Sequence, residues 1–328
     1  MIHFRETRIL RMLCAIAIMF AFFNTIDASA DTSHSYIDEL LTNPVYKSTL
    51  NTRIKLITVP LSKNYEKNEK KNTEPIRFLI QGGLHGNEIL TSKFVIWLAK
   101  KTEEGKSLLN SLPENSVIDF IPYANPDAYG LSRYNQNNVN LNRNFSILWG
   151  ISKEPNGSHP FSEAETTAIR DLMIRREYLA AIDVHGYTNW IVVPSKPKYF
   201  TEQNSKEKTD RYNRWISAVS SHIRNLPSYE LKDDFELGDG GSFEDWAFWS
   251  NNTLALCMEL SKPLRFINDH GINKDSFENY ESFIYQMFES ALQIKNGTHK
   301  YKNEMSISQK NISHNLPRSR QVFNSHFN

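Results

Sequence analysis

Short, almost continuously apolar segments alternate with longer amphipathic segments through the middle of this chain of 328 residues. Segments of the first kind are typical of strands buried on both faces, because both alternating sets of side chains must then be apolar. Amphipathic segments of about ten residues or more are typical of helices that cover such a sheet. The pattern therefore predicts an α/β fold, a single domain with a mixed, mostly parallel, twisted sheet and helices on both faces.

The boundaries of these elements follow from the apolar runs and their spacing. The predicted strands are Ile54–Val59, Ile76–Ile80, Val117–Pro122, Ala180–Val184, Trp190–Val193 and Thr253–Leu260. The predicted helices are Ile89–Lys101, Ser162–Glu177, Thr209–Asn225 and Phe277–Ile294. Ser162 and Glu165 have the spacing of a capping box, in which two side chains bond the free N–H groups of a helix start.

Both ends of the chain differ in composition from the middle. Residues 1–30 resemble a secretory signal peptide, with a basic start, an apolar run and a small-residue cleavage site. These parts are Arg5, Arg8 and Arg11, then Met12–Phe23, then Ala28-Ser29-Ala30. The apolar run is short for a bilayer span, and an uncleaved membrane anchor is the alternative. We expect residues 31–296 to form the folded domain and the polar residues 297–328 to be a disordered tail.

Cysteine content and charge narrow the compartment and the partners. Once the signal peptide is removed, Cys257 is the remaining cysteine, so no disulfide forms within the chain. Its place in an apolar strand favours a small core residue over a reactive thiol. An exported protein without disulfides suits a bacterial periplasm, so we expect a periplasmic or secreted protein without stable membrane insertion. The net charge of +1, without a basic block, argues against a nucleic-acid partner.

A His and a Glu lie three residues apart directly after one predicted strand, in Gln81-Gly-Gly-Leu-His85-Gly-Asn-Glu88. The two glycines allow a sharp turn at the strand end. Imidazole nitrogen and carboxylate oxygen are both zinc ligands, and three protein ligands with an open position is the catalytic arrangement. By itself, a His-x-x-Glu pair is weak support for a metal site.

Two later strand ends strengthen this hypothesis. His185 ends an apolar strand in Ala181-Ile-Asp-Val-His185, and Glu259 lies among apolar residues in Leu254-Ala-Leu-Cys-Met-Glu259. A buried carboxylate is costly without a partner or a function. In open α/β sheets, ligands bind at the strand ends, where these side chains are predicted to meet.

Two arginines lie in a segment rich in asparagine and turn-forming residues, from Asn125-Pro-Asp127 to Phe145. Neither Arg133 nor Arg143 belongs to an amphipathic helix. The planar guanidinium suits a carboxylate or a polarised carbonyl group. For either arginine alone, a surface salt bridge is the simpler interpretation.

Taken together, these residues resemble the zinc metallocarboxypeptidase family, the carboxypeptidase A-like clan, in which a murein peptide amidase branch is one possibility. The matching motifs are His85-Gly-Asn-Glu88, Asn125-Pro-Asp127, Arg133-x-Asn135, Val139-x-Leu-Asn-Arg-Asn-Phe145, His159-Pro-Phe-Ser-Glu-x-Glu165, Asp183-Val-His-Gly-Tyr187, Gly240-Gly-Ser242 and Met258-Glu-Leu260. They come in the family's order and span most of residues 75–260. The resemblance implies a zinc carboxypeptidase-like catalytic domain.

The resemblance also implies roles for individual residues. His85, Glu88 and His185 match the ligands of one zinc ion per chain. Glu259 matches the general base that activates the attacking water and passes the proton to the leaving amine. Arg133 matches the group that stabilises the oxyanion, and Asn142 and Arg143 match the clamp on the substrate's terminal carboxylate. The resemblance places Tyr187 and Asp245 beside the substrate.

Two departures from the family pattern concern the substrate. Glu236 stands where the family commonly has a Tyr that caps the bound carboxylate. The segment Gly241-Ser-Phe-Glu-Asp-Trp246 is one residue longer than in the digestive enzymes, which brings Glu244 and Asp245 towards the specificity pocket. Asp245 is alternatively a helix-start residue, and this is the simpler interpretation.

The leading hypothesis is a zinc exopeptidase or amidase that cleaves a peptide bond near a free carboxylate, on cell-wall muropeptides or other envelope peptides. Glu236, Glu244 or Asp245 would then pair with the ammonium group of a diamino acid. The alternatives are a general or basic-residue carboxypeptidase and an amidohydrolase of N-acyl amino acids resembling aspartoacylase or succinylglutamate desuccinylase. A non-enzyme alternative is an inactive peptide-binding module, which would have lost a zinc ligand or the base.

Overall fold

The computed structural model describes residues 47–62, 74–196, 198, 206–226, 228–261, 267–268, 271–272 and 274–297. By its internal contacts the chain separates into residues 1–45 and 46–328, and all described residues belong to the second unit. The predicted signal peptide and the predicted tail after Gly297 lie outside the described residues. Among the described helices, none is long and apolar enough to span a membrane.

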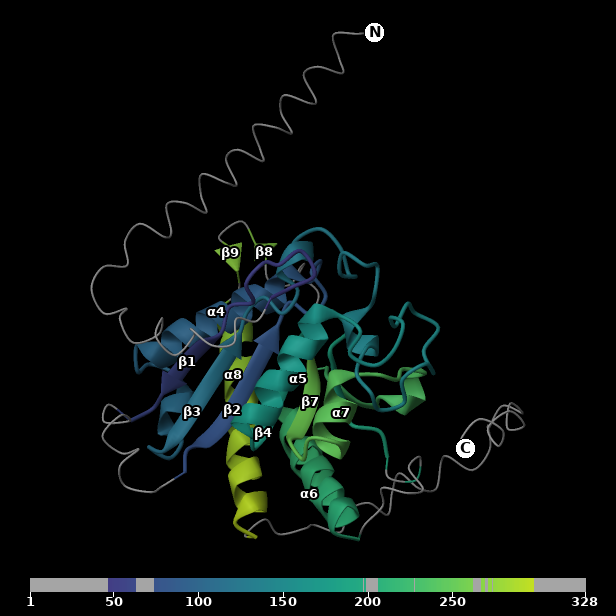
Figure 1. Cartoon of the computed structure of the whole chain (residues 1–328). Coiled ribbons are helices and arrows are strands. Elements are labelled where there is room, and N and C mark those ends of the chain that lie inside the picture. The colour runs from purple at the N-terminus through teal and green to yellow at the C-terminus, as the bar shows by residue number, and fades with distance from the viewer. Residues whose placement is uncertain are drawn as a thin grey trace, which may run out of the picture. The chain divides into compact units, whose positions relative to one another are not determined.

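A seven-stranded mixed sheet forms the centre of the domain (Figure 1). In order across the sheet, the strands are β1 (Ile57–Pro60), β3 (Ser116–Ile121), β2 (Ile76–Gly82), β4 (Ala180–Gly186), β7 (Leu254–Leu260), β5 (Trp190–Val193) and β6 (Glu230–Asp233). Strands β3, β2, β4 and β7 are parallel, and so are β5 and β6, whereas β1 and β5 pair antiparallel with β3 and β7. The predicted mixed, mostly parallel sheet is confirmed. A separate pair is formed by β8 (Ile267–Asn268) and β9 (Gly271–Ile272).

Helices lie on both faces of this sheet. The α-helices are α4 (Ile89–Glu103), α5 (Ala164–Arg176), α6 (Lys206–His222), α7 (Phe243–Trp249) and α8 (Lys274–Lys295). Short 3₁₀ helices are η3 (Leu108–Ser111), η4 (Pro126–Ala128), η5 (Leu141–Arg143), η7 (Ile223–Asn225) and η8 (Phe235–Leu237). Figure 1 shows α5 in front of the sheet and α8 behind it.

The core contacts explain why the strands are apolar on both sides. Phe78 of β2 stacks on Phe288 of α8, with ring centroids 4.3 Å apart. On the side of α5, Leu172 and Ile121 line a small apolar cavity together with Leu56. Because the parallel strands are covered on both faces, neither alternating set of side chains meets water.

Among the elements that were not predicted, β6 and α7 lie in or against the main sheet. The edge strand β6 pairs with β5 alone, and its residues Glu230 and Lys232 are charged, so it lacks the apolar pattern of a central strand. Every residue of the short helix α7 is buried, including Glu244 and Asp245. A helix that is buried all round has no amphipathic periodicity, so the pattern that revealed the other helices was absent.

The predicted capping box at the start of α5 is wrong. The helix begins at Ala164, its N-cap is Glu163, and no side chain caps it. Glu165 is held elsewhere, because its Oε1 accepts a hydrogen bond from the backbone N–H of Thr49 at 2.8 Å. Its Oε2 accepts from the Thr49 hydroxyl at 3.0 Å. A tertiary contact has therefore replaced the local one.

The parallel strands β2, β4 and β7 end at the same edge of the sheet, and the chain turns there after Gly83. Gly83 has φ of +70°, and a Cβ atom at this position would lie 2.6 Å from Ser92 Oγ. A side chain would therefore be excluded on both grounds, and the loop from β2 to α4 needs glycine here. This loop carries His85.

Candidate metal and substrate site

The predicted metal ligands and the predicted base come together at this sheet edge. His85 and Glu88 lie in the loop between β2 and α4, whereas His185 is the second-last residue of strand β4. In the parallel pairing of β4 with β7, His185 stands directly beside Glu259. The Asn125-Pro-Asp127 motif supports the loop, because Asn125 donates its side-chain N–H to the carbonyl oxygen of Leu84 at 3.3 Å.

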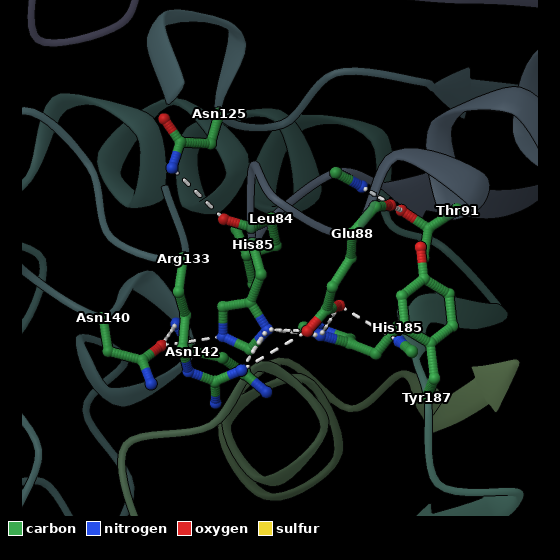
Figure 2. Close-up of polar contacts among 12 residues, drawn as sticks. Leu84, His85, Glu88, Thr91, Asn125, Arg133, Asn140, Asn142, His185 and Tyr187 are labelled. Carbon is green, nitrogen blue, oxygen red and sulfur yellow. Dashed lines mark hydrogen bonds and ion pairs between the residues drawn. The ribbon is translucent and has the colours of Figure 1, made fainter. Parts of the chain in front are cut away.

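His85, Glu88 and His185 are buried, and each offers a ligand atom within 4.8 Å of the other two (Figure 2). Nδ1 of His85 lies 2.9 Å from Glu88 Oε1, and Nδ1 of His185 lies 3.3 Å from Glu88 Oε2. Glu88 Oε2 also accepts the backbone N–H of Gly186 at 3.0 Å, which fixes the carboxylate against the end of strand β4. Two imidazoles and one carboxylate form the three-ligand set of a catalytic zinc site.

Nε2 of each imidazole already has a hydrogen-bond partner within the protein. Nδ1 is therefore the nitrogen of each ring that is left for a metal ion. Nε2 of His185 lies 2.8 Å from Asp183 Oδ2, and Nε2 of His85 lies 2.9 Å from Asn140 Oδ1. Carboxylate and amide oxygens only accept, so both Nε2 atoms carry the proton. The Nδ1 atoms, which keep the lone pairs when the rings are neutral, lie 3.0 Å apart. Ligands at about 2.0–2.1 Å from one tetrahedral zinc are roughly 3.3 Å apart, so the residues fit this ion.

Burial and neighbouring charges shift the pKa values of the two histidines in opposite directions. Burial lowers the pKa of His85, which keeps its ring neutral. Burial acts in the same direction on His185, but the carboxylates of Asp183 and Glu88 outweigh it and raise the pKa of His185 well above its usual value. A metal ligand must be deprotonated, so a metal ion and a proton compete for Nδ1 of His185.

The guanidinium group of Arg133 lies next to the proposed metal ligands, beside the His85 ring (Figure 2). Its Nη1 lies 3.1 Å from His85 Nδ1 and 3.3 Å from Glu88 Oε1. The side chain is about a third exposed, at 34%, so the guanidinium borders both the ligands and the solvent. A guanidinium in this place meets negative charge that develops on a carbonyl oxygen near the metal.

Asn142 and Arg143 lie in η5 and are buried. Oδ1 of Asn142 accepts the backbone N–H of Phe243 at 2.8 Å, which ties η5 to the start of α7. The backbone of Gly241 packs so closely on η5 that a Cβ atom there would lie 2.3 Å from the carbonyl oxygen of Arg143. The Gly240-Gly-Ser242 motif thus holds the arginine in place, and Ser242 also caps α7 by accepting from Asp245 N–H.

Glu259 is positioned as a base. Its Oε2 is buried and has no hydrogen-bond partner among the described residues. Burial raises the pKa of Glu259 to about 7, with further increases from Glu88 and Asp183 and opposite effects from His185 and Arg133. A carboxyl group with a pKa near neutrality can both take and deliver a proton at physiological pH.

The comparisons with known proteins agree with this geometry. The family model described as zinc carboxypeptidase matches residues 35–295. The chain belongs to the zinc carboxypeptidase family. It is therefore a zinc-dependent peptide hydrolase, a metallocarboxypeptidase, and His85, Glu88 and His185 form a site that can hold its zinc ion. Among curated proteins, none matches the chain.

Solved structures of the family share the fold. Carboxypeptidase A from Helicoverpa armigera is 20% identical with a TM-score of 0.58, and the match covers 82% of this chain and 78% of that one. Bovine thrombin-activatable fibrinolysis inhibitor in complex with tick carboxypeptidase inhibitor is 20% identical with a TM-score of 0.56, over 80% and 94% of the two chains. A murein-tripeptide amidase from Escherichia coli O157 is 20% identical with a TM-score of 0.41, over 76% and 90% of the two chains.

The remaining sequence candidates have different surroundings. Tyr187 is half-buried beside the ligands, and its hydroxyl oxygen accepts the backbone N–H of Leu90 at 3.2 Å. Asp245 is completely buried, and its two oxygens accept from the backbone N–H and the hydroxyl of Ser195 at 2.6 and 2.7 Å. These bonds and its place in the first turn of α7 support its interpretation as a residue of the helix start.

The other two acidic candidates are also removed from solvent or already paired. Glu244 is buried in α7, and burial together with Asp234 raises the pKa of Glu244 well above its usual value. Glu236 forms an ion pair with Lys196. Neither side chain offers a free negative charge to a substrate.

Four polar residues of the site had no role in the sequence hypothesis. Asn140 and Asp183 hold the far nitrogens of the two imidazoles, while Glu154 and Asp239 contact the two arginines. Asp183 lies two residues before His185 on one strand, so strand periodicity places both side chains on the same face. Glu154 and Asp239 come from loops distant in sequence from Arg133, and local patterns do not indicate them.

Proposed function

We propose that this zinc carboxypeptidase hydrolyses a peptide bond next to a free carboxylate, on cell-wall muropeptides or other peptides of the envelope. The observation that carries the proposal is that Arg143 is buried and one of its N–H groups has no partner among the described residues. Its side chain is only 6% exposed, and its Nε is buried with no hydrogen-bond partner among the described residues. A buried guanidinium with an unsatisfied N–H keeps one donor for the carboxylate of a substrate.

The roles of the other residues follow from their positions. Asn142 and Arg143 would hold the carboxylate, and Arg133 would bond the carbonyl oxygen of the scissile bond. Glu259, beside His185 across the two strands, would take the proton from the attacking water and deliver it to the leaving amine. When bound, zinc supplies Lewis-acid polarisation of that carbonyl group. The hydrogen bonds that the two imidazoles donate to Asp183 and Asn140 would keep both rings in orientation.

The choice of a muropeptide rests on two features. The first 30 residues resemble an export signal, which would bring the enzyme to the cell envelope. Acidic side chains near Arg143 suit a substrate that carries an ammonium group as well as a carboxylate, as a diamino acid does. The same acidic side chains suit a carboxypeptidase specific for basic C-terminal residues, which is the second candidate.

Digestion of a substrate panel separates these functions. The panel contains muropeptides that end in a diamino acid, peptides with C-terminal Lys, Leu or Glu, and N-acyl amino acids, and products are identified by mass spectrometry. Release of the diamino acid at the highest kcat/KM supports the proposal, and Glu259→Gln enzyme serves as the matched inactive control. If the C-terminal Lys peptide is cleaved faster than every muropeptide, the basic-residue carboxypeptidase is the correct function.

The proposed export has its own test. The full chain is expressed with a C-terminal tag in a bacterial host, and the N-terminus of the fractionated protein is sequenced. Cleavage after Ala30 with recovery from the periplasm is the expected result. Recovery of uncleaved protein with the membranes would favour the anchor interpretation.

A further inference from the structure

Both arginines of the site are already paired with acidic side chains of the protein itself. Nη2 of Arg143 lies 2.5 Å from Asp239 Oδ1 and 3.7 Å from Glu154 Oε1. Nε of Arg133 lies 3.3 Å from Glu154 Oε2. Carboxylates therefore already balance both guanidinium groups, since Arg133 also pairs with Glu88 Oε1 at 3.3 Å.

The two carboxylates are anchored to different extents. Oε2 of Glu154 also accepts a hydrogen bond from the Asn140 side chain at 2.7 Å. Burial opposes the charge of Glu154, but Asn140 and Arg133 together lower the pKa of its carboxyl group. Asp239 has its ion pair with Arg143, and burial raises the pKa of the Asp239 carboxyl group although Arg143 opposes this. Glu154 therefore belongs to a fixed network, whereas Asp239 depends on one cation.

Asp239 covers one half of the binding face of Arg143. Nη1 of the guanidinium donates to the carbonyl oxygen of Asn142 at 2.6 Å, so this nitrogen is used within the protein. The Nε and Nη2 side is the fork that a carboxylate binds with both oxygens. Nε has no partner in the described part of the chain, and Nη2 carries Asp239. A substrate carboxylate on this fork brings a second negative charge next to Asp239 at Nη2, and the two carboxylates repel each other.

We infer that Asp239 is a specificity-determining residue, which exchanges its pair with Arg143 for a pair with an ammonium group of the substrate. The inference rests on the proposed function, because it needs Arg143 to bind the substrate's carboxylate. A substrate with the carboxylate alone leaves Asp239 without a partner in a site where its side chain is only 24% exposed. A substrate with both groups gives Asp239 a new cationic partner. The site therefore selects residues that carry a second, cationic group, and rejects those that lack it.

A purely structural role of Asp239 gives a different expectation. If Asp239 only orients Arg143, its loss weakens the binding of every carboxylate to the same extent. If Asp239 binds the ammonium group, its loss affects only substrates that have this group. Pairs of substrates that differ in the amino group alone separate the two roles.

The experiment compares unmodified enzyme with Asp239→Asn on two such pairs. One pair is a muropeptide ending in diaminopimelate and its analogue ending in 2-aminopimelate, and the other is a peptide ending in Lys and its analogue ending in norleucine. We expect unmodified enzyme to prefer the amino-bearing member of a pair by about tenfold or more in kcat/KM, the usual scale of one charged hydrogen bond. In Asp239→Asn this preference is expected to disappear, because kcat/KM falls for the amino-bearing substrate and not for its analogue.

Binding of the products gives a readout that does not depend on turnover. Calorimetric titration with diaminopimelate, 2-aminopimelate, lysine and norleucine is expected to show the same preference and the same loss. Glu236→Gln is the matched control, since Glu236 lies in the adjacent helix η8 and pairs with Lys196. Thermal unfolding of each variant shows that the fold is retained.

The outcomes distinguish this inference from the proposed function. An equal loss on both members of a pair, or no preference in the unmodified enzyme, overturns the role of Asp239. Loss of the preference in Glu236→Gln instead would assign it to Glu236. If unmodified enzyme cleaves neither muropeptide but shows an Asp239-dependent preference for Lys, the muropeptide assignment fails and the role of Asp239 stands.

Discussion

Asn140 is bonded to His85 through its side-chain oxygen, which lies 2.9 Å from Nε2 of the imidazole. The amide nitrogen of Asn140 donates to Glu154 Oε2 at 2.7 Å, so the amide cannot turn without losing this bond. One side chain thus fixes the orientation of a metal ligand and connects it to the carboxylate that lies between the two arginines. Loss of such a contact to a ligand commonly weakens metal affinity by about 10–100-fold.

We therefore expect Asn140→Ala to lower zinc affinity by about 10–100-fold, the usual scale for an outer contact to a ligand. Asn140→Asp keeps an acceptor for the imidazole N–H and is expected to retain more of the affinity. Competitive titration with a zinc chelator measures both. Asn115→Ala, at a half-buried position just before strand β3, is the control. Equal affinity in the alanine variant and the unmodified enzyme would mean that Asn140 has no part in orienting His85.

Removal of a ligand is expected to remove the metal. His185→Ala leaves two protein ligands, fewer than the three of a catalytic zinc site, so we expect far less than one zinc per chain and no measurable turnover. Elemental analysis of the dialysed protein measures the metal directly. The matched variant is His159→Ala, because His159 is exposed and outside the ligand set. Full zinc content in His185→Ala would show that this residue is not a ligand.

Replacement of the proposed base separates catalysis from binding. Glu259→Gln keeps the shape of the side chain but removes the proton acceptor, so turnover is expected to fall by roughly 10²-fold or more. Zinc content and product affinity are expected to stay close to those of the unmodified enzyme. Loss of the metal together with residual turnover would instead make Glu259 a ligand.

The pH dependence of the reaction follows from the same residue. Burial raises the pKa of Glu259 to about 7, and the positive charge of a bound metal ion lowers it again. A base acts only when ionised, so kcat/KM is expected to rise with pH, with a midpoint below about 7. The residual activity of Glu259→Gln should lack this ascending limb. A limb that persists unchanged in the variant would belong to another group.

The sequence predicted the sheet and the metal ligands because both depend on local patterns. Apolar runs identify strands such as Ala180–Gly186, and the strand ends place His185 near His85 even though 100 residues separate them. Asp239 and Glu154 illustrate the limit. Their role comes from loops that meet only in the folded chain, and a charged residue in a loop is usually solvated. Two of the acidic candidates, Glu244 and Asp245, are buried because α7 is buried all round, and for the same reason this helix lacked an amphipathic pattern.

A polar network away from the site is expected to contribute to stability. Asp119 of β3 is fully buried and accepts from Arg176 Nη1 at 2.6 Å, from the Tyr178 hydroxyl at 2.5 Å and from the Thr58 hydroxyl at 2.6 Å. Asp119→Ala removes the partner of a largely buried cation, which typically costs about 3–5 kcal/mol. Tyr178→Phe removes one neutral donor and is expected to cost less, about 1–3 kcal/mol. Urea unfolding measures both, and a smaller loss in Asp119→Ala than in Tyr178→Phe would contradict this ranking.

Recognition of a free carboxylate distinguishes a carboxypeptidase from other zinc hydrolases, and Arg143 is the residue that decides it. A charge-assisted contact is typically worth about 1.5–3 kcal/mol. Amidation of the substrate's terminal carboxylate is therefore expected to reduce kcat/KM at least about tenfold, since each 1.4 kcal/mol is a factor of roughly ten. Arg143→Ala enzyme is expected to hydrolyse free and amidated substrates at nearly equal, low rates, because the group that distinguishes them is gone. Arg170→Ala, on the surface of α5, is the control that keeps the discrimination. Equal turnover of the two substrates by unmodified enzyme would leave Arg143 as a structural partner of Asp239 and rule out carboxylate recognition at this site.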